Sequence, residues 1–209
     1  MLRVRSLEVA GALMPDTRAA LQSRKRQIRR ESRRRRAELS DEVRYLASAR
    51  IADAVVRGEF FYRSRYIACY LPMADEVDTW PIIERAWRRK KKIFAPVTGR
   101  DRMLTFREVR PGSNLIRNDF GLLEPETGAE IDRRRLDLVL TPLVAYDAER
   151  RRIGMGGGYY DRTFAFLKNR TLMFKPKLVG LAFNCQRVKK IAENPWDIPL
   201  YRIVTESGQ

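Results

Sequence analysis

Residues 66–72, Tyr-Ile-Ala-Cys-Tyr-Leu-Pro, form a short apolar run that ends at a proline. Apolar runs of this length, bounded by turn residues, are typical of buried strands. We expect further strands along the chain at 92–96, 103–109, 136–141, 178–183 and 203–205. The strand at 103–109 is expected to be antiparallel and nearer an edge of the sheet.

Between these runs the apolar residues change to helical spacing. Ser40 is expected to cap a helix over about 41–57, whose apolar residues return every three or four positions. Thr79 is expected to cap a second helix with Pro81 in its first turn, and a third helix is expected to start over 159–168. Short strands that alternate with amphipathic helices predict a layered α/β/α domain, with a largely parallel mixed sheet and a basic N-terminal helix.

The chain has 209 residues, which is enough for one domain with a full core. We expect this domain to span residues 23–209, after a loosely ordered N-terminal extension over residues 1–22. Glu8 interrupts the apolar residues of the extension, so we do not expect a signal peptide. No apolar run approaches the roughly 18 residues of a spanning helix, and the two cysteines lie in apolar stretches, so a cytoplasmic protein is expected. Residues 110–135 are interpreted as a long functional loop.

The chain is strongly basic and lacks one residue type entirely. It has 43 Lys and Arg residues against 26 Asp and Glu, a net charge of +17, which favours anionic partners such as nucleic acid or phosphates. It has no histidine, which excludes a Ser-His-Asp triad, a Cys-His pair and every histidine-liganded metal site.

Much of the positive charge lies in residues 24–36, Arg-Lys-Arg-Gln-Ile-Arg-Arg-Glu-Ser-Arg-Arg-Arg-Arg. Strong helix formers dominate this stretch. Lys25, Arg26 and Arg29 have a spacing that can place their charges along one side of a helix, facing phosphates. The four consecutive arginines Arg33–Arg36 point around a helix and are interpreted as a solvated basic face. An alternative is that the whole stretch is an arm that follows a nucleic-acid backbone.

The most informative motif is residues 152–162, Arg-Ile-Gly-Met-Gly-Gly-Gly-Tyr-Tyr-Asp-Arg, between a predicted strand and a predicted helix. Glycine amides and a helix N-terminus can form a cradle for phosphate. Arg152 can supply a guanidinium to a transferring phosphoryl group, and Asp161 can hold Mg²⁺ against the phosphates. The pattern differs from the Walker A loop and from G-x-G-x-x-G. A plain tight turn is the alternative for the glycines alone.

This motif resembles the Arg-Leu-Gly-Tyr-Gly-Gly-Gly-Tyr-Tyr-Asp-Arg signature of the 5-formyltetrahydrofolate cyclo-ligase family, also called 5,10-methenyltetrahydrofolate synthetases. Residues 25–29 resemble the family's N-terminal basic helix, and residues 71–79 resemble its first strand-to-helix loop. Residues 193–200 and 204–206 resemble its C-terminal motif. The resemblance spans about 24–206 and keeps the family's order of motifs.

The resemblance implies ATP- and Mg²⁺-dependent cyclisation of 5-formyltetrahydrofolate to 5,10-methenyltetrahydrofolate by a monomer, with release of ADP and phosphate. It makes Arg152 the catalytic residue and Asp161 and Asp197 the metal ligands. The implied ATP-binding residues are Lys25, Arg26, Gln27, Ile28, Arg29, Arg152, Ile153, Gly154, Met155, Gly156, Gly157, Gly158, Tyr159 and Tyr160. The implied folate-binding residues are Leu71, Glu76, Phe120, Met155, Gly156, Gly157, Gly158 and Tyr159.

Two of these assignments have open alternatives on the sequence alone. Glu76 would accept adjacent N–H donors of a pterin ring, or it would cap the helix that begins near Thr79. Phe120 would stack on a ring of the substrate, or it would pack within its loop.

The chain also departs from the family pattern at three positions. Trp196 stands where histidine is common, Tyr201 where an acid is common, and Met155 where tyrosine is common. Two other functions therefore stay open at this point: a folate- or nucleotide-binding relative without catalysis, and a nucleic-acid-binding protein. No membrane partner and no specific nucleic acid are expected for the enzyme.

Overall fold

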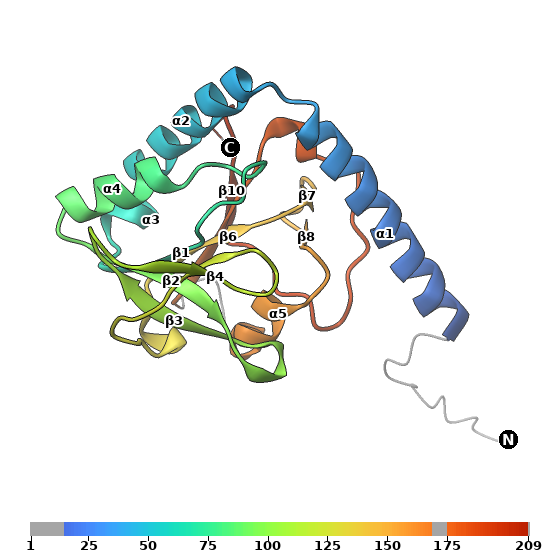
Figure 1. The fold of residues 1–209 in the computed structure, drawn as a ribbon. Helices are drawn as coiled ribbons and strands as arrows, with labels where there is room; N and C mark the ends of the chain where they lie inside the picture. The colour runs from blue at the N-terminus through green and yellow to red at the C-terminus, as the bar shows by residue number, and fades with distance from the viewer. Residues whose placement is uncertain (1–14, 169–174, 209) are drawn as a thin grey trace, which may run out of the picture.

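A six-stranded sheet forms the centre of the fold, in the order β10-β9-β6-β1-β2-β3 (Figure 1). The structure is a computed structural model that describes residues 15–168 and 175–208. Five strands run parallel and β3 is antiparallel to β2. The strands are β1 (Tyr66–Cys69), β2 (Lys92–Thr98), β3 (Leu104–Val109), β6 (Leu138–Pro142), β9 (Lys177–Leu181) and β10 (Arg202–Val204).

The predicted layered α/β/α class with a largely parallel mixed sheet is confirmed, and so is the antiparallel edge strand. Strand β1 lies in the middle, where Ile67 pairs with Leu138 on one side and Ile93 on the other. These three side chains are almost completely buried. Parallel strands that are covered on both faces have continuous apolar runs, which is why the sequence pattern located them well.

One face of the sheet is covered by α2 (Asp41–Arg57), α3 (Glu59–Tyr62) and α4 (Trp80–Arg88). Ser40 caps α2 as predicted, because its hydroxyl accepts a hydrogen bond from the Val43 amide at 3.2 Å. Thr79 occupies the N-cap position of α4 with Pro81 in the first turn, as predicted, but its side chain makes no capping hydrogen bond. The Thr79 hydroxyl donates instead to the Tyr70 carbonyl at 2.8 Å, and the Trp80 amide donates to Asp78.

The other face is covered by short elements rather than by one long helix. They are α5 (Tyr159–Thr163) and the 3-10 turns η2 (Arg133–Arg135) and η3 (Ala165–Leu167). Two further 3-10 turns lie elsewhere: η1 (Arg100–Arg102) joins β2 to β3, and η4 (Asn184–Gln186) packs against α1. The helix expected over 159–168 ends at Thr163, because the chain turns there to bury Phe164 against Phe106, with ring centroids 5.8 Å apart.

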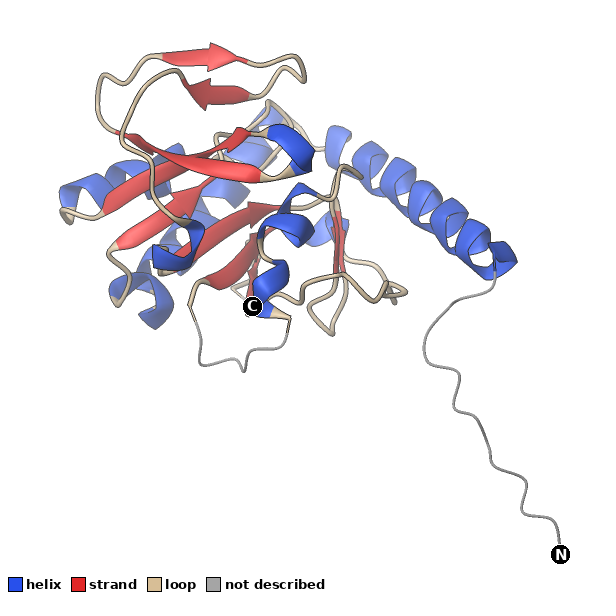
Figure 2. Ribbon diagram, turned by 90° about the horizontal axis from the view of Figure 1, so that it is seen from below, coloured by secondary structure: helices blue, strands red, loops and turns tan. Residues whose placement is uncertain are grey.

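Residues 110–135 are not one long loop, which corrects the prediction. Strand β4 (Leu115–Arg117) pairs with β5 (Leu123–Pro125) in an antiparallel ribbon that stands off the main sheet (Figure 2). Leu115 and Leu123 pack against the main core, and a turn containing Gly121 at φ +75° joins the strands. Three-residue strands lie below the length at which alternation is visible in a sequence.

Helix α1 (Pro15–Ala37) runs along one side of the molecule (Figure 1). Residues 15–22, expected to be loosely ordered, belong to this helix, while residues 1–14 lie outside the described residues. Ile28 packs against Ala145, Ile153 and Ile191, which anchors the helix to a small ribbon of β7 (Ala145–Tyr146) and β8 (Arg152–Ile153). Within the described residues, no helix is both long and apolar enough to cross a membrane.

Candidate active site

A cavity of about 440 Å³ opens where β1, β2 and β6 end. The carboxyl edge of a parallel sheet is the usual position of a ligand site, because the loops that follow the strands meet there. Helix α1 and the β4–β5 ribbon also contribute to its wall. The predicted site residues that line it are Lys25, Arg29, Leu71, Glu76, Phe120, Arg152, Ile153, Gly154, Met155, Gly156, Gly157, Gly158, Tyr159, Tyr160, Asp161 and Asp197.

Three predicted residues of α1 do not line the cavity. Arg26 is exposed, Gln27 bonds to Glu31 on the outer side of the helix, and Ile28 packs on the apolar cluster described above. Lys25 and Arg29 differ from them because residues four apart lie on the same helix face.

The glycine-rich loop is attached to α1 through Arg29. The Nε of Arg29 donates to the Gly154 carbonyl at 2.8 Å. Gly156 has φ +111° and Gly158 has φ +71°, so both have backbone conformations that L residues rarely adopt. Burial is the main cause that lowers the pKa of the Arg29 guanidinium, and the neighbouring Arg33 and Arg26 add to it.

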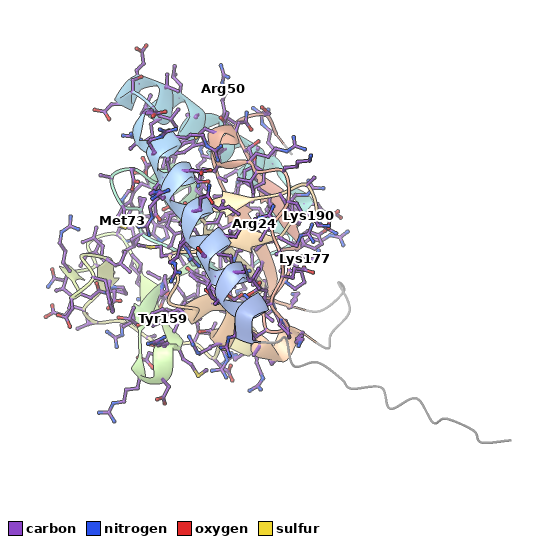
Figure 3. All side chains as sticks on the ribbon, turned by 90° about the vertical axis from the view of Figure 1, so that its right-hand side faces the viewer. Arg24, Arg50, Met73, Tyr159, Lys177 and Lys190 are labelled. Carbon is purple, nitrogen blue, oxygen red and sulfur yellow. The ribbon has the colours of Figure 1, made fainter. Side chains whose placement is uncertain are left out.

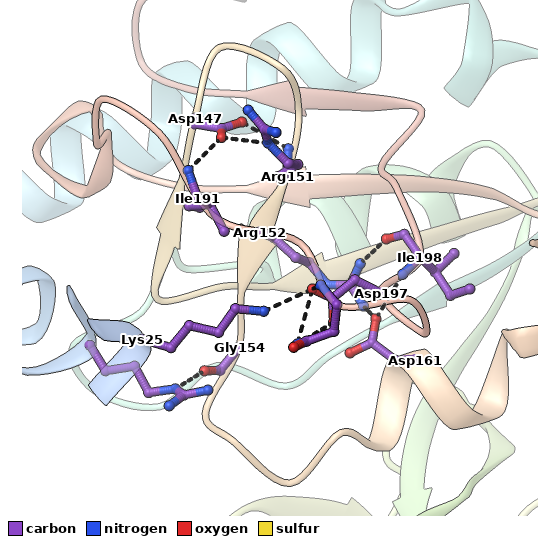
Figure 4. A network of polar contacts seen from close by, with 11 residues as sticks. Lys25, Asp147, Arg151, Arg152, Gly154, Asp161, Ile191, Asp197 and Ile198 are labelled. Carbon is purple, nitrogen blue, oxygen red and sulfur yellow. Dashed lines mark hydrogen bonds and ion pairs between the residues drawn. The ribbon is translucent and has the colours of Figure 1, made fainter. Parts of the chain in front are cut away.

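Arg152, the first residue of the motif at 152–162, lies in β8, which pairs with β7. Its side chain is 6% exposed, and its two terminal nitrogens have different partners. One donates to Asp161 Oδ1 at 2.7 Å and the other to the Ile198 carbonyl at 2.6 Å (Figure 4). The Ile198 amide also donates to Asp161 Oδ1, at 3.2 Å. The bonds that Asp161 accepts from the described residues therefore all end on one oxygen.

Asp197 is paired with a cation as well. Lys25, whose side chain is 7% exposed, donates to Asp197 Oδ2 at 2.8 Å (Figure 4). The Asn194 amide donates to the same oxygen at 2.9 Å, and the Asn194 side chain reaches both oxygens. Among the described residues there is no group of three or more Cys, Asp and Glu side chains that could hold a metal.

Glu76 lies at the other side of the cavity and is 8% exposed. Its Oε2 accepts a hydrogen bond from the Met73 amide at 3.2 Å, and its Oε1 lies 4.0 Å from Arg36. Burial raises the pKa of the Glu76 carboxyl, while the Met73 amide and Arg36 oppose this shift. The alternative that Glu76 caps α4 is wrong, since the first amide of that helix bonds to Asp78.

Comparisons with known proteins place this chain in a family. The model of the 5-formyltetrahydrofolate cyclo-ligase family matches residues 21–206. The chain belongs to that family. It is 32% identical to 5-formyltetrahydrofolate cyclo-ligase of Haemophilus influenzae over 87% of this chain and 97% of the relative. The Escherichia coli cyclo-ligase is 38% identical over 68% of this chain and 78% of that protein.

Solved structures agree with this membership. The NMR structure of Aquifex aeolicus 5,10-methenyltetrahydrofolate synthetase has a TM-score of 0.73 and 30% sequence identity, covering 87% of this chain and 89% of that one. The synthetase of Mycoplasma pneumoniae, at 24% identity and a TM-score of 0.69, shares the fold.

One arginine of this cyclo-ligase contradicts the sequence interpretation. Arg36 is not part of a solvated face: it is 6% exposed and donates through Nε and Nη2 to Asp75 Oδ2 at 3.0 and 2.6 Å. Arg33 and Arg34 are exposed, as predicted. The position of Arg36 on the helix explains why it is buried and Arg33 and Arg34 are not. Spacings of four, three and four residues place Lys25, Arg29, Ser32 and Arg36 on one face, the inward stripe of α1.

Aromatic and other apolar side chains surround the mouth of the cyclo-ligase cavity. The ring of Phe120 is 63% exposed and meets Tyr159 edge-on, with centroids 6.5 Å apart. Met155 and Trp196 are also about half exposed there, and the guanidinium of Arg18 lies 5.6 Å from the Trp196 ring. Trp196, which stands where histidine is common in the family, thus contributes to the mouth of the cavity in this chain.

Several cavity residues were missed by the sequence interpretation. Tyr70 directly precedes the predicted Leu71, and its hydroxyl donates to the Val77 carbonyl at 3.1 Å. Its place at the end of a buried strand was the available signal. Glu124 had no such signal, since its ribbon was interpreted as a loop. The other missed residues are Gln22, Pro96, Thr98, Leu104, Leu122, Leu123, Pro142, Leu143, Asn194 and Trp196.

Proposed function

We propose that this chain is an ATP-dependent 5-formyltetrahydrofolate cyclo-ligase that forms 5,10-methenyltetrahydrofolate, ADP and phosphate. Family membership supports the activity. The observation that supports it most within the molecule is the division of one cavity into two chemically different ends. The glycine loop, Arg29 and Arg152 supply amide and cationic groups to one part of the cavity, and Glu76 supplies a buried carboxylate, with Arg36 beside it, to another.

The reaction needs activation of a formamide oxygen, which is a poor leaving group. Transfer of the γ-phosphoryl group of ATP to that oxygen gives an iminium phosphate and ADP. The N10 amine of the folate attacks the activated carbon and releases its proton to solvent, and loss of phosphate completes the ring. The protein has to hold two substrates in line and balance phosphate charge, which is how phosphoryl transfer is generally catalysed.

At the end that holds the glycine loop, the assigned residues act on phosphate charge. The amides of Gly156 and Gly158 belong to a loop whose positive φ angles suit an anion cradle. Arg152 is held by Asp161 and the Ile198 carbonyl, so its guanidinium is positioned before substrate binds. Preorganised charge of this kind stabilises a transition state without reorganisation.

Asp161 fits a Mg²⁺ ligand better than Asp197 does. Its hydrogen bonds from the described residues all end on Oδ1, whereas both oxygens of Asp197 are engaged by Lys25 and Asn194. Magnesium commonly takes one or two protein carboxylates and completes its shell with phosphate oxygens and water. Bound there, it would neutralise charge on the ATP phosphates.

At the other end, Glu76 is assigned to the pterin edge. A fixed carboxylate can accept two adjacent N–H groups, and Glu76 is fixed by the Met73 amide and faces Arg36. Leu71 supplies apolar wall, and the exposed ring of Phe120 is available for stacking at the mouth.

The alternative of a nucleic-acid arm explains less of the structure. The inward stripe of α1 faces the cavity and the loop after β1, which a backbone-tracking arm would not require. A monomer that acts in the cytoplasm is proposed, as the family resemblance implies. No specific nucleic acid is proposed as a partner.

An absorbance assay for the methenyl product tests the activity. The purified chain is incubated with 5-formyltetrahydrofolate and Mg²⁺, with ATP in one sample and a non-hydrolysable ATP analogue in another. We expect product only with ATP, together with one phosphate per ring closed. Folate binding without product would support the non-catalytic relative. Tight, sequence-selective nucleic-acid binding at physiological salt without product would support a nucleic-acid-binding protein.

A further inference from the structure

We infer that Arg36 is a positioning residue for the folate end of the site, holding Glu76 in place from the far end of helix α1. The inference rests on the proposed function, because it assigns Glu76 to the folate. It adds a residue that the sequence interpretation placed in solvent.

The contacts of Arg36 divide its guanidinium into two parts. Nε and Nη2 both donate to Asp75 Oδ2, at 3.0 and 2.6 Å. Nη1 lies 4.0 Å from Glu76 Oε1. The planar guanidinium has a rigid donor geometry, so the fork on Asp75 fixes the direction in which Nη1 points. Asp75 thereby orients Nη1 of Arg36 towards Glu76, the residue that follows Asp75 in the sequence.

Each oxygen of Glu76 consequently has a partner: a hydrogen bond on one oxygen and a facing charge on the other. The Met73 amide donates to Oε2 at 3.2 Å, and Arg36 faces Oε1. The side chains of Arg36 and Glu76 are 7% and 8% exposed, so water screens their interaction little. A charge at this distance favours the ionised carboxylate, which is the form that accepts two N–H groups.

Other charged and titratable groups also act on this carboxylate. Those that face it from the surrounding elements are Arg33 and Arg36 of α1, Asp75 of its own loop, Tyr70 after β1 and Tyr160 of α5. Burial raises the pKa of Glu76, Asp75 raises it further, and Arg36 is the larger of the two opposing arginines. Removal of Arg36 therefore shifts Glu76 towards its neutral form.

The same helix carries the contacts of both ends of the site. Lys25 bonds to Asp197 and Arg29 bonds to the glycine loop. Arg36, eleven residues after Lys25 on the same helix, bonds to the loop after β1. Viewed from its outer side, α1 lies between Met73 and Tyr159 on one hand and Lys190 on the other (Figure 3). Because the stripe divides in this way, a change at Arg36 is expected to act on folate and not on ATP.

The experiment compares Arg36→Gln, Arg36→Lys and the control Arg34→Gln, which removes an equal charge from a side chain that is 76% exposed. Binding of 5-formyltetrahydrofolate and of ATP is measured separately by calorimetry, and KM and kcat for both are measured between pH 6 and 8.5. At pH 7 we expect Arg36→Gln to weaken folate binding about tenfold, or about 1.4 kcal/mol, with ATP binding within about twofold.

The pH dependence separates positioning from a structural effect. The loss of folate affinity in Arg36→Gln should shrink as the pH rises, because Glu76 then ionises without help. Arg36→Lys keeps the charge but not the fork on Asp75, so it should restore part of the folate affinity. Equal folate binding by Arg36→Gln and Arg34→Gln would overturn the inference. So would a loss that is the same for folate and ATP, independent of pH and not rescued by lysine. Absence of folate binding and product in the unmodified chain would instead overturn the proposed function.

Discussion

The ammonium group of Lys25 lies 2.8 Å from Asp197 Oδ2, although the two residues are 172 positions apart. This ion pair joins the first helix to the C-terminal segment at the wall of the cavity. It also neutralises a carboxylate that the family resemblance assigns to metal. ATP binding is therefore expected to depend on Lys25 both directly, through phosphate charge, and through the position of Asp197.

Replacement of Lys25 by Met should weaken ATP binding about tenfold or more and lower stability by about 1–3 kcal/mol, since a part-buried carboxylate loses its partner. The KM for ATP and the urea midpoint are the measurements. Arg30→Gln, on the exposed side of the same helix, is the control and should leave both within about twofold. An unchanged KM for ATP in Lys25→Met would remove Lys25 from the ATP site.

Replacement of Arg152 by Lys should reduce turnover about 100-fold while folate KM changes less than about threefold. A lysine keeps the charge but cannot span Asp161 and the Ile198 carbonyl with two fixed donors. Steady-state kinetics with each substrate varied separates the two constants. Arg150→Lys, at an exposed side chain outside the cavity, is the control. Unchanged turnover with weaker folate binding would contradict the catalytic assignment.

Asp161→Ala should abolish turnover, and the isosteric Asp161→Asn should raise the Mg²⁺ concentration needed for half-maximal rate. Asparagine keeps an oxygen that can accept from Arg152 but lacks the negative charge that a hard cation requires. A Mg²⁺ titration of the rate is the measurement, with the exposed Asp41→Asn as control. Near-normal activity of either Asp161 variant at low Mg²⁺ would refute the metal assignment.

Glu76→Gln should lose most folate binding yet become more stable than the unmodified chain at pH 7. Burial raises the pKa of Glu76 in the folded state, so the folded protein holds this proton more tightly than the unfolded chain does. The free energy of unfolding therefore falls as the pH rises from the unfolded pKa of about 4.3 towards the raised pKa of the folded state. At higher pH the unmodified chain keeps this full loss of stability. Glutamine does not ionise, so the variant does not lose this stability.

Urea unfolding of both proteins at pH 4 and pH 7 checks this sign. The advantage of Glu76→Gln should be present at pH 7 and small at pH 4, where the carboxyl is largely protonated in both states. A lower stability of the variant at pH 7 would mean that the contacts to Met73 and Arg36 outweigh the cost of burying the charge.

The elements that the sequence predicted well depend on local patterns. The buried strands β1, β6 and β9 were located within about two residues because each is one continuous apolar run. Ser40 was identified as a cap because capping uses neighbours only three residues away. The motif at 152–162 likewise contains most of its chemistry within eleven consecutive positions, and it was enough to indicate the family.

By itself, then, the sequence determined the fold class and the family, and it predicted many of the residues that line the cavity. Only the tertiary structure decided the partners of the charges: that Lys25 pairs with Asp197, that Arg152 is held by Asp161, and that Arg36 is buried. The identity of a residue sets its charge and its reach, whereas its burial depends on which distant segment packs over it. Four consecutive arginines look equivalent in a sequence, but the helical turn directs just one of them, Arg36, onto Asp75.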